Sequence, residues 1–239
     1  MTLALLLAAV LALPAQAPVV EERIVGGQFA VIVSPPKPTD RVVIVAHGAG
    51  HSARSMLNDI EPVTDELLAR GYTIAASDAH FNAWGNRASR RDYIRLARLM
   101  RDRGLRRVYV LARSMGGLAT LGALPRLRPE AWAGIYPACH IGSLRRYAAG
   151  IGRAWGRPFW YLHGLARLNP LRIRGVAGMP MIFWASYGDT VVRRALNTDR
   201  CAEQAERAGA RVTVVDTVGD HGHPSNMQPQ RLADFFDDA

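Results

Sequence analysis

The sequence has 239 residues, of which 49% are hydrophobic, and a mean hydropathy of -0.01. This length fits one large domain with a sizeable core, and the composition excludes a disordered chain. The formal net charge of +10 comes almost entirely from arginine, since Lys37 is the only lysine, and such an excess favours anionic surfaces or substrates.

The N-terminus carries the pattern of an export signal. An apolar run rich in leucine and alanine is followed by Ala15-Gln16-Ala17, a small-x-small cleavage site. The run is short for a membrane span, and no Lys or Arg precedes it. We therefore expect residues 1–17 to be a signal peptide and residues 18–239 to form a secreted, extracytoplasmic protein. The alternative is an apolar N-terminal helix that stays in the fold.

Short β-rich runs alternate with helical patterns along the rest of the chain. The predicted strands are Arg23–Val33 with a bend at Gly26-Gly27, Arg41–Ala46, Tyr72–Ser77, Val108–Arg113, Ala133–Ala138, Met179–Ser186 and Arg211–Thr217. The predicted helices are Ser52–Arg70, Ser89–Arg103 with a capping box at Ser89 and Asp92, Leu118 to about Pro125, Val192–Ala208 and Asn226–Phe236. This order predicts an α/β fold, with a mostly parallel twisted central sheet and helices on both faces.

Three arginines fall on one face of the predicted helix Ser89–Arg103, namely Arg91, Arg95 and Arg98. Such a stripe either contacts nucleic acid or forms a solvated outer face. No aromatic residues are interleaved with these arginines, so we expect a solvated face and no nucleic-acid partner.

Residues 140–178 separate two predicted strands by much more than one helix requires. No acidic residue occurs between Glu130 and Asp189. The segment is rich in aromatic residues and arginines, among them Trp155, Phe159, Trp160, Tyr161, Arg145, Arg146, Arg153, Arg157, Arg167, Arg172 and Arg174. An insertion at this point lies over the carboxyl edge of the sheet, where open α/β sheets bind ligands. It forms either a basic, aromatic-lined cap or a helical excursion whose aromatics belong to the core.

The chain has two cysteines, Cys139 and Cys201. In an exported protein they can form a disulfide, and the alternative is two separate buried thiols. Spacing alone does not decide between these. Two cysteines so far apart do not indicate a zinc site.

The stretch Val108–Gly117 has the pattern of a nucleophile elbow. An apolar β-rich run ends just before Ser114, and glycines and a helix-favouring segment follow it. In an elbow the strand turns sharply into a helix and lifts the serine hydroxyl clear of the sheet. Ala112 and Gly116 occupy the two flanking positions, where strand and helix pass close together. The usual pattern has glycine at both, and Ala112 departs from it by one methyl group.

A serine nucleophile needs a base and an acid that orients the base. Asp189 follows the predicted strand Met179–Ser186, and His221 follows the last predicted strand, so both reach the sheet edge that carries the elbow. We predict that Ser114, Asp189 and His221 form a catalytic triad. His223 is the competing base, although the proline after it restricts its backbone.

A second interpretation of the C-terminal histidines is a metal site. Its ligands would be Asp216, Asp220, His221 and His223. That site needs convergent ligands and explains nothing at Ser114, so we predict no metal.

The tetrahedral intermediate of an acyl transfer needs two hydrogen-bond donors for its oxyanion. One is the backbone amide of Met115, directly after the serine. The other comes from the loop after the predicted strand Arg41–Ala46, where we assign Ala49, with Gly50 as the alternative. Glycines in this loop let a backbone amide approach the substrate closely. His47 is expected to be a structural histidine.

Together and in this order, these motifs resemble those of the α/β-hydrolase family. They are His-Gly-x-Gly at 47–50, the elbow at Ser114, Gly-Asp-x-Val-Val at 188–192 and Gly-x-His-Gly at 219–222. The match runs from about Arg41 to the C-terminus. The resemblance implies an eight-stranded sheet, a Ser-Asp-His triad and no cofactor. Haloalkane dehalogenases and epoxide hydrolases of this superfamily use an aspartate nucleophile, and Ser114 argues against both.

The sequence therefore predicts a secreted serine hydrolase that cleaves carboxylic esters through an acyl-enzyme. Its substrate would be a small-molecule or lipid ester, and the basic segment 140–178 points to an anionic lipid or envelope surface as a possible partner. Two alternatives stay open. One is an acyltransferase with the same triad, and the other is a binding module that keeps the fold without catalysis.

Overall fold

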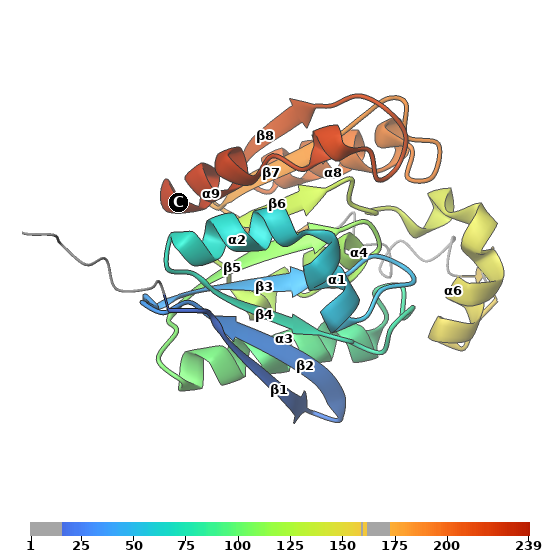
Figure 1. Cartoon of the computed structure of the whole chain (residues 1–239). Helices are drawn as coiled ribbons and strands as arrows, with labels where there is room; N and C mark the ends of the chain where they lie inside the picture. The colour runs from blue at the N-terminus through green and yellow to red at the C-terminus, as the bar shows by residue number, and fades with distance from the viewer. Residues whose placement is uncertain (1–15, 159, 162–172) are drawn as a thin grey trace, which may run out of the picture.

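The computed structural model describes residues 16–158, 160–161 and 173–239 of the chain (Figure 1). Within these residues eight strands form one sheet, in the order β1-β2-β4-β3-β5-β6-β7-β8. The strands are β1 (Val19–Val25), β2 (Gln28–Ser34), β3 (Arg41–Ala46), β4 (Thr73–Ser77), β5 (Arg107–Arg113), β6 (Trp132–Ile135), β7 (Pro180–Ala185) and β8 (Arg211–Asp216).

The sheet is mostly parallel, as predicted. β1 and β2 form an antiparallel hairpin, and β2 pairs antiparallel with β4, whereas every pair from β4 through β3 to β8 is parallel. The hairpin turns at Gly26 and Gly27, whose φ angles of 60° and 87° suit a two-residue turn. The expected N-terminal hairpin is therefore present and starts earlier than predicted, at Val19.

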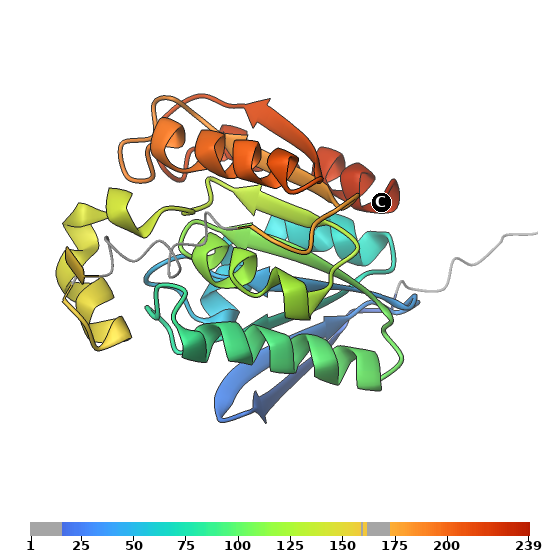
Figure 2. The ribbon, with the colours of Figure 1, turned by 180° about the vertical axis from the view of Figure 1, so that it is seen from behind.

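Helices cover both faces of the sheet, which confirms the predicted layers. The α-helices are α1 (Ala53–Asp59), α2 (Glu61–Ala69), α3 (Arg87–Asp102), α4 (Gly116–Leu121), α5 (Leu124–Leu127), α6 (Ala148–Trp155), α8 (Thr198–Arg207) and α9 (Pro229–Asp237). Short 3-10 helices lie at η1 (Ile141–Ser143), η2 (Arg145–Tyr147), η3 (Arg194–Leu196) and η4 (Pro224–Asn226). Figure 1 shows α1, α2 and α9 in front of the sheet, and Figure 2 shows α3, α4 and α8 behind it.

The core consists of two apolar layers, one on each face of the sheet. β3 contributes to both, because alternate side chains of a strand point to opposite faces. Val42 and Ile44 pack on the side of α3 and α8, and Val43 and Val45 pack on the side of α2 and α9. All four are fully buried. This is why β3 reads as a continuous apolar run in the sequence.

Two predicted helices have different boundaries. The helix predicted over Ser52–Arg70 is two helices that break at Ile60, because Pro62 in the first turn of α2 has no N–H to donate to a longer helix. α3 starts at Arg87 instead of Ser89, because the Asn86 side chain accepts hydrogen bonds from the amides of Ala88 and Ser89, both at 3.0 Å. The predicted capping box of Ser89 and Asp92 is therefore wrong.

Three other elements begin or end at different residues than predicted. β6 ends at Ile135, where Tyr136 takes a φ of 37° that a strand does not allow. The helix predicted from Val192 begins only at Thr198, after the short turn η3. The last helix begins at Pro229, a residue favoured in the first turn.

The arginine face of α3 is solvated, as predicted. Arg91, Arg95 and Arg98 are all exposed.

The two cysteines, Cys139 and Cys201, are fully buried free thiols. Burial and the neighbouring Cys201 thiol raise the pKa of Cys139 well above its ordinary value.

None of the helices in the described part of the chain is long and apolar enough to cross a membrane. Most of the predicted signal peptide, together with Phe159, Arg167 and Arg172 of the segment 140–178, lies outside the described residues.

Candidate active site

Ser114 lies at the sharp turn between β5 and α4. Its φ of 48° is left-handed, which is unfavourable for a non-glycine residue and is typical of the serine in a nucleophile elbow. The backbone around it is fully bonded. The Ser114 amide donates to the Ile135 carbonyl at 3.0 Å, and the Ser114 carbonyl accepts from Gly117 at 3.0 Å and Ala138 at 2.8 Å. These bonds hold the turn in its strained conformation.

The small residues that flank the serine are needed for close packing. A Cβ atom at Gly116 would overlap the Ala46 carbonyl oxygen at the end of β3. Ala112 pairs with Ala46 on one side and with Gly134 on the other. These neighbours are small, so the extra methyl of Ala112 fits where the usual pattern has glycine.

Asp189 lies in the loop after β7, and its carboxylate is almost completely buried, with 5% of the residue exposed. Its Oδ1 accepts hydrogen bonds from the amides of Val191 at 2.9 Å and Val192 at 2.8 Å. These two bonds fix the carboxylate and leave Oδ2 for a third partner.

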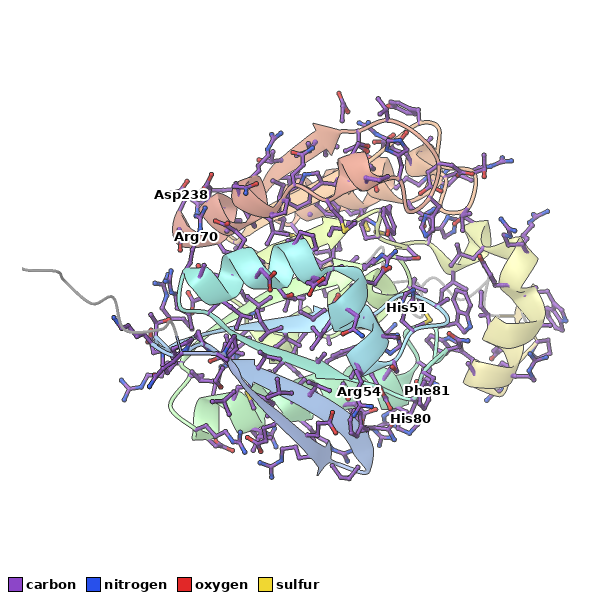
Figure 3. All side chains as sticks on the ribbon, viewed as in Figure 1. His51, Arg54, Arg70, His80, Phe81 and Asp238 are labelled. Carbon is purple, nitrogen blue, oxygen red and sulfur yellow. The ribbon has the colours of Figure 1, made fainter. Side chains whose placement is uncertain are left out.

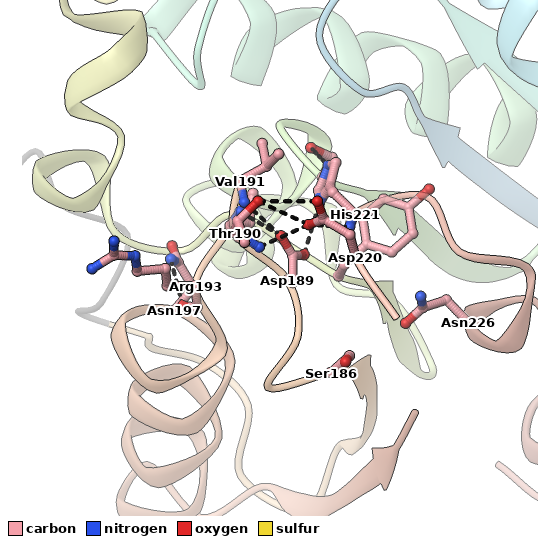
Figure 4. A network of polar contacts seen from close by, with 12 residues as sticks. Ser186, Asp189, Thr190, Val191, Arg193, Asn197, Asp220, His221 and Asn226 are labelled. Atoms are coloured by element: carbon pink, nitrogen blue, oxygen red, sulfur yellow. Dashed lines mark hydrogen bonds and ion pairs between the residues drawn. The ribbon is translucent and has the colours of Figure 1, made fainter. Parts of the chain in front are cut away.

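His221 lies in the loop after β8, beside Asp189 (Figure 4), and connects the other two residues. Its Nδ1 lies 2.7 Å from Asp189 Oδ2, and its Nε2 lies 3.0 Å from Ser114 Oγ. A carboxylate only accepts hydrogen bonds, so Nδ1 carries the hydrogen and Nε2 presents its lone pair to the serine hydroxyl. The structure thus brings the three predicted residues into one continuous hydrogen-bonded chain.

His223, the competing base, faces elsewhere. Its Nδ1 lies 3.0 Å from Ser225 Oγ and accepts from the Ser225 amide at 3.2 Å, at the start of η4. The histidine is exposed and makes no hydrogen bond with Ser114. Its role in the structure is to cap a turn.

Asp220, next to His221, connects the loop after β8 to the loop after β7. Its Oδ1 accepts from the Thr190 amide at 2.8 Å and from the His221 amide at 2.7 Å, as Figure 4 shows. Bonds from the Thr190 amide, from the His221 amide and from the Thr190 hydroxyl hold the pKa of Asp220 below its ordinary value. In the sequence, Asp220 is a candidate only as a metal ligand, and no motif there predicts this connection.

Tyr136 forms a wall beside the imidazole. Its ring centroid lies 4.3 Å from that of His221, and its hydroxyl accepts from Arg113, which also pairs with Asp59. Burial raises the pKa of Tyr136, so the residue stays neutral at ordinary pH. No sequence motif marks this tyrosine.

The loop after β3 lies directly against the elbow. A Cβ atom at Gly48 would be 3.4 Å from the Ser114 Cβ. The Gly50 amide donates to Asn82 Oδ1 at 2.7 Å and is therefore occupied. Within the described residues, the amides of Ala49 and Met115 have no protein acceptor. Of the two predicted candidates in this loop, the geometry leaves Ala49 as the amide that can face an oxyanion together with Met115.

His47 is buried and bonded to the backbone, as expected for a structural histidine. Its Nδ1 lies 2.8 Å from the Gly48 carbonyl, and its Nε2 lies 2.8 Å from the Asp78 carbonyl. These contacts tie the loop after β3 to the loop after β4.

The loop after β4 is the part of the site that sequence reasoning missed most completely. Four of its non-glycine residues have positive φ angles, namely Ala79, His80, Phe81 and Trp84. Such backbone strain persists only where surrounding contacts enforce it. One such contact is that between His80 Nδ1 and the buried Asp92 carboxylate, at 2.6 Å. Figure 3 shows His80 and Phe81 at the end of the sheet that carries α6. This loop supplies Asn82, which accepts the Gly50 amide of the loop after β3.

An apolar cluster lines the other side of the elbow. It joins Met115 and Leu118 to residues of segment 140–178 and the loop after Asp189, and its buried members are Trp84, Met115, Leu118, Ala138, Ile141, Leu144, Ile151 and Val192. Several contacts attach α6 to the loop after β4. Trp155 Nε1 donates to the Trp84 carbonyl at 3.0 Å, and Asn86 Nδ2 donates to the Ala154 carbonyl at 2.7 Å.

The segment 140–178 is partly core and partly surface. Ile141, Leu144 and Ile151 are buried, whereas Trp160 is 75% exposed and Tyr161 is 38% exposed. α6 stands beyond the carboxyl ends of the parallel strands (Figure 1). The described part of the segment therefore has features of both interpretations of the sequence.

The proposed metal ligands do not converge. Asp216 pairs with Arg194, and Asp220 bonds Thr190. Among the described residues, no group of three or more His, Cys, Asp or Glu side chains is arranged to hold a metal ion.

Comparisons with known proteins agree with this architecture. An esterase/lipase structure from an uncultured bacterium superposes with a TM-score of 0.70 at 18% identity, covering 94% of this chain and 85% of that chain. The Pyrococcus furiosus esterase Pf2001 gives a TM-score of 0.69 at 18% identity, covering 92% of each chain. EstE5-PMSF gives 0.67 at 19% identity, covering 93% of this chain and 85% of the other. No family model and no curated protein matches the sequence. The chain has the α/β-hydrolase fold that its motifs predicted.

Proposed function

We propose that this protein is a serine hydrolase that cleaves carboxylic esters. The observation that carries the proposal is the hydrogen-bonded chain from Ser114 Oγ through His221 to Asp189, with contacts of 3.0 and 2.7 Å. The esterase and lipase names of the structural neighbours support the same reaction class.

The chemistry follows from the geometry. Ser114 Oγ attacks the ester carbonyl while its proton passes to His221 Nε2, and the amides of Ala49 and Met115 bind the resulting oxyanion. The intermediate expels the alcohol, which takes the proton from Nε2, and an acyl-enzyme remains. Water then gives a proton to Nε2 and attacks the acyl group, and collapse releases the carboxylic acid and returns the proton to Ser114. Asp189 Oδ2 accepts the Nδ1 hydrogen of His221 in each step and stabilises the imidazolium when it forms.

The test is hydrolysis of a series of p-nitrophenyl esters together with labelling by a fluorophosphonate probe. We expect both in the wild type, and loss of labelling with at least about a 10⁴-fold fall in kcat for Ser114→Ala. Ser34→Ala, at the opposite edge of the sheet in β2, should behave as wild type.

Other outcomes decide between the alternatives. An added alcohol that takes the acyl group in preference to water would identify an acyltransferase. A folded wild type that neither labels nor hydrolyses would contradict catalysis and favour a binding module.

Secretion is also part of the proposal, and it depends on the sequence of residues 1–17. Expression of the whole chain in a bacterium, followed by N-terminal sequencing of the exported protein, tests it. A mature protein that starts at Pro18 is the expected result, and a cell-retained protein with an intact N-terminus would contradict it.

A further inference from the structure

A pocket of about 600 Å³ lies between the start of segment 140–178 and the loop that follows Asp189. We call it the arginine pocket, because its lining includes His140, Arg145, Arg146, Thr190, Arg193 and Arg200. No acidic side chain is among its lining residues. Val191 lines the pocket and also packs against the apolar cluster beside the elbow.

The four arginines of this pocket share two properties. All four are exposed, and none of their guanidinium groups makes an ion pair with a described residue. Arg194, the next residue after Arg193, shows the contrast, because it is buried and pairs with both Asp199 and Asp216.

The nearby carboxylates are already occupied. Asp189 binds His221, Asp220 binds Thr190 and Asp199 binds Arg194. None of these carboxylates pairs with the four arginines, so within the described residues no direct ion pair neutralises the guanidinium groups of the pocket. Four like charges around one concave surface create a strong field for anions, and planar guanidinium groups match the oxygens of carboxylate and phosphate.

The arginine pocket adjoins the catalytic loop. Thr190 lines the pocket while its amide binds Asp220, and Val191 lines it while its amide binds the Asp189 carboxylate. Figure 4 shows Arg193 extending from this same loop on the side away from His221. A substrate held at Ser114 therefore has a positively charged surface beside the loop that carries its catalytic acid.

We propose that the arginine pocket binds a carboxylate or phosphate group of the substrate, so that the enzyme selects anionic esters over neutral ones. This inference rests on the proposed function for its catalytic half, since it assumes ester hydrolysis at Ser114. Its binding half concerns the pocket alone and can be tested without turnover.

The first experiment measures binding in a protein that cannot turn over. Ser114→Ala protein is titrated with glutarate and, separately, with inorganic phosphate by calorimetry at low ionic strength. We expect saturable binding of at least one anion, weakened about tenfold by Arg193→Gln and by Arg200→Gln, as loss of a charge-assisted hydrogen bond predicts. Comparison of the two anions shows whether the pocket favours carboxylate or phosphate.

Arg98→Gln is the matched control, because it removes one exposed arginine from the outer face of α3. It should leave anion binding unchanged. Circular dichroism and thermal unfolding confirm that all variants are folded. Either of two results overturns the proposed anion site. One is equal anion binding by the Arg193→Gln, Arg200→Gln and Arg98→Gln variants, and the other is no saturable binding of either anion.

The second experiment uses the active enzyme. Mono-4-nitrophenyl glutarate is compared with 4-nitrophenyl pentanoate, which has the same acyl length, and 4-acetoxybenzoate with 4-acetoxybenzamide. We expect kcat/KM to favour the anionic member of at least one pair. That preference should fall about tenfold in Arg193→Gln and should decline with added salt.

The binding experiment and the kinetic experiment distinguish the proposed anion pocket from the proposed esterase activity. Anion binding without hydrolysis of any ester retains the pocket and refutes the proposed esterase. Ester hydrolysis with no anionic preference in either pair refutes the pocket as a substrate site and retains the esterase.

Discussion

The proposed catalytic edge of the sheet, where Ser114, Asp189 and His221 meet, and the segment 140–178 are held in very different ways. At the edge, Asp189 accepts three hydrogen bonds, and the Ser114 backbone makes three. α6 is attached through the Trp155 and Asn86 bonds and through Ile151, which is buried in the apolar cluster. Just before α6, the Tyr147 ring packs on Trp84 with centroids 4.8 Å apart. Many of the arginines around it are exposed.

This difference separates the two tasks of the proposed enzyme. Proton transfer depends on tenths of an ångström, so its groups need several constraints each. Recognition of a substrate tolerates more movement and depends on charge and shape. We therefore expect substitutions at the catalytic edge to lower kcat strongly, and substitutions in the segment 140–178 to change mainly KM and selectivity.

The largest effect is expected for Asp189→Asn. The amide would donate a hydrogen to His221 Nδ1 and force the wrong tautomer, with the hydrogen of Nε2 facing Ser114. We expect kcat to fall about 10³-fold to 10⁴-fold, with little change in KM. Steady-state kinetics on a p-nitrophenyl ester measures this.

Asp220→Asn is the control for that substitution, because Asp220 also bonds the His221 residue but only through its backbone amide. We expect a decrease of a few-fold. If both variants lose activity to the same extent, the distinct role of Asp189 is wrong.

The next effect concerns the support of the oxyanion loop. Asn82→Ala removes the acceptor of the Gly50 amide and loosens the neighbouring Ala49 amide. We expect kcat to fall about 10-fold to 100-fold, which is less than the loss of an oxyanion donor itself. Asn58→Ala, an exposed change on α1, should have no effect. An unchanged kcat in Asn82→Ala would show that the loop holds its shape without this bond.

A smaller effect is expected where segment 140–178 attaches to the body. Trp155→Phe keeps the aromatic ring but removes the donor to the Trp84 carbonyl. We expect a loss of about 1 kcal/mol in the free energy of unfolding, together with a few-fold change in KM. The kcat for a short ester should stay constant. Urea unfolding and steady-state kinetics measure these, and a large fall in kcat would contradict the division between the two regions.

The smallest effect lies outside both regions, at the contact of α9 with β3 and α2. Partial burial alone would raise the pKa of Asp237, but hydrogen bonds from Arg70, Tyr72 and Arg41 outweigh it and hold that pKa below its ordinary value of 3.8. A carboxyl whose pKa is lower in the folded state stabilises the fold above about pH 4, and this contribution is lost as the pH falls through the folded pKa.

Asp237→Asn should therefore lower stability at neutral pH and show a shallower loss of stability below about pH 4. Thermal unfolding as a function of pH measures both. Activity per folded molecule at neutral pH should equal that of the wild type, and parallel stability curves for the two proteins would refute the role of Asp237.

Much of this architecture follows from local patterns. Arg41–Ala46 is a run of apolar residues with both faces buried, and its strand was predicted with the correct bounds. The elbow around Ser114 was predicted because a β-rich run, a serine and glycines follow one another directly. The predicted N-terminal cap of α3 at Ser89 is wrong, because the Asn86 side chain caps the helix instead and accepts the Ser89 amide. The Asp92 carboxylate, the other half of the predicted capping box, contacts His80.

The sequence by itself determined the parallel α/β fold, the position of the turn at Ser114 and the loops that bring an acid and a histidine to one edge of the sheet. These features depend on the period of apolar residues and on turn chemistry within a few positions. The sequence favoured His221 over His223, and the tertiary structure added the 3.0 Å contact of His221 Nε2 with Ser114 Oγ. The tertiary structure alone decided the occupation of the Gly50 amide by Asn82 and the gathering beside Thr190 of arginines that pair with no described carboxylate. Each of these joins groups far apart in the chain, and a hydrogen bond or a charge field depends on distances that only the packed fold defines.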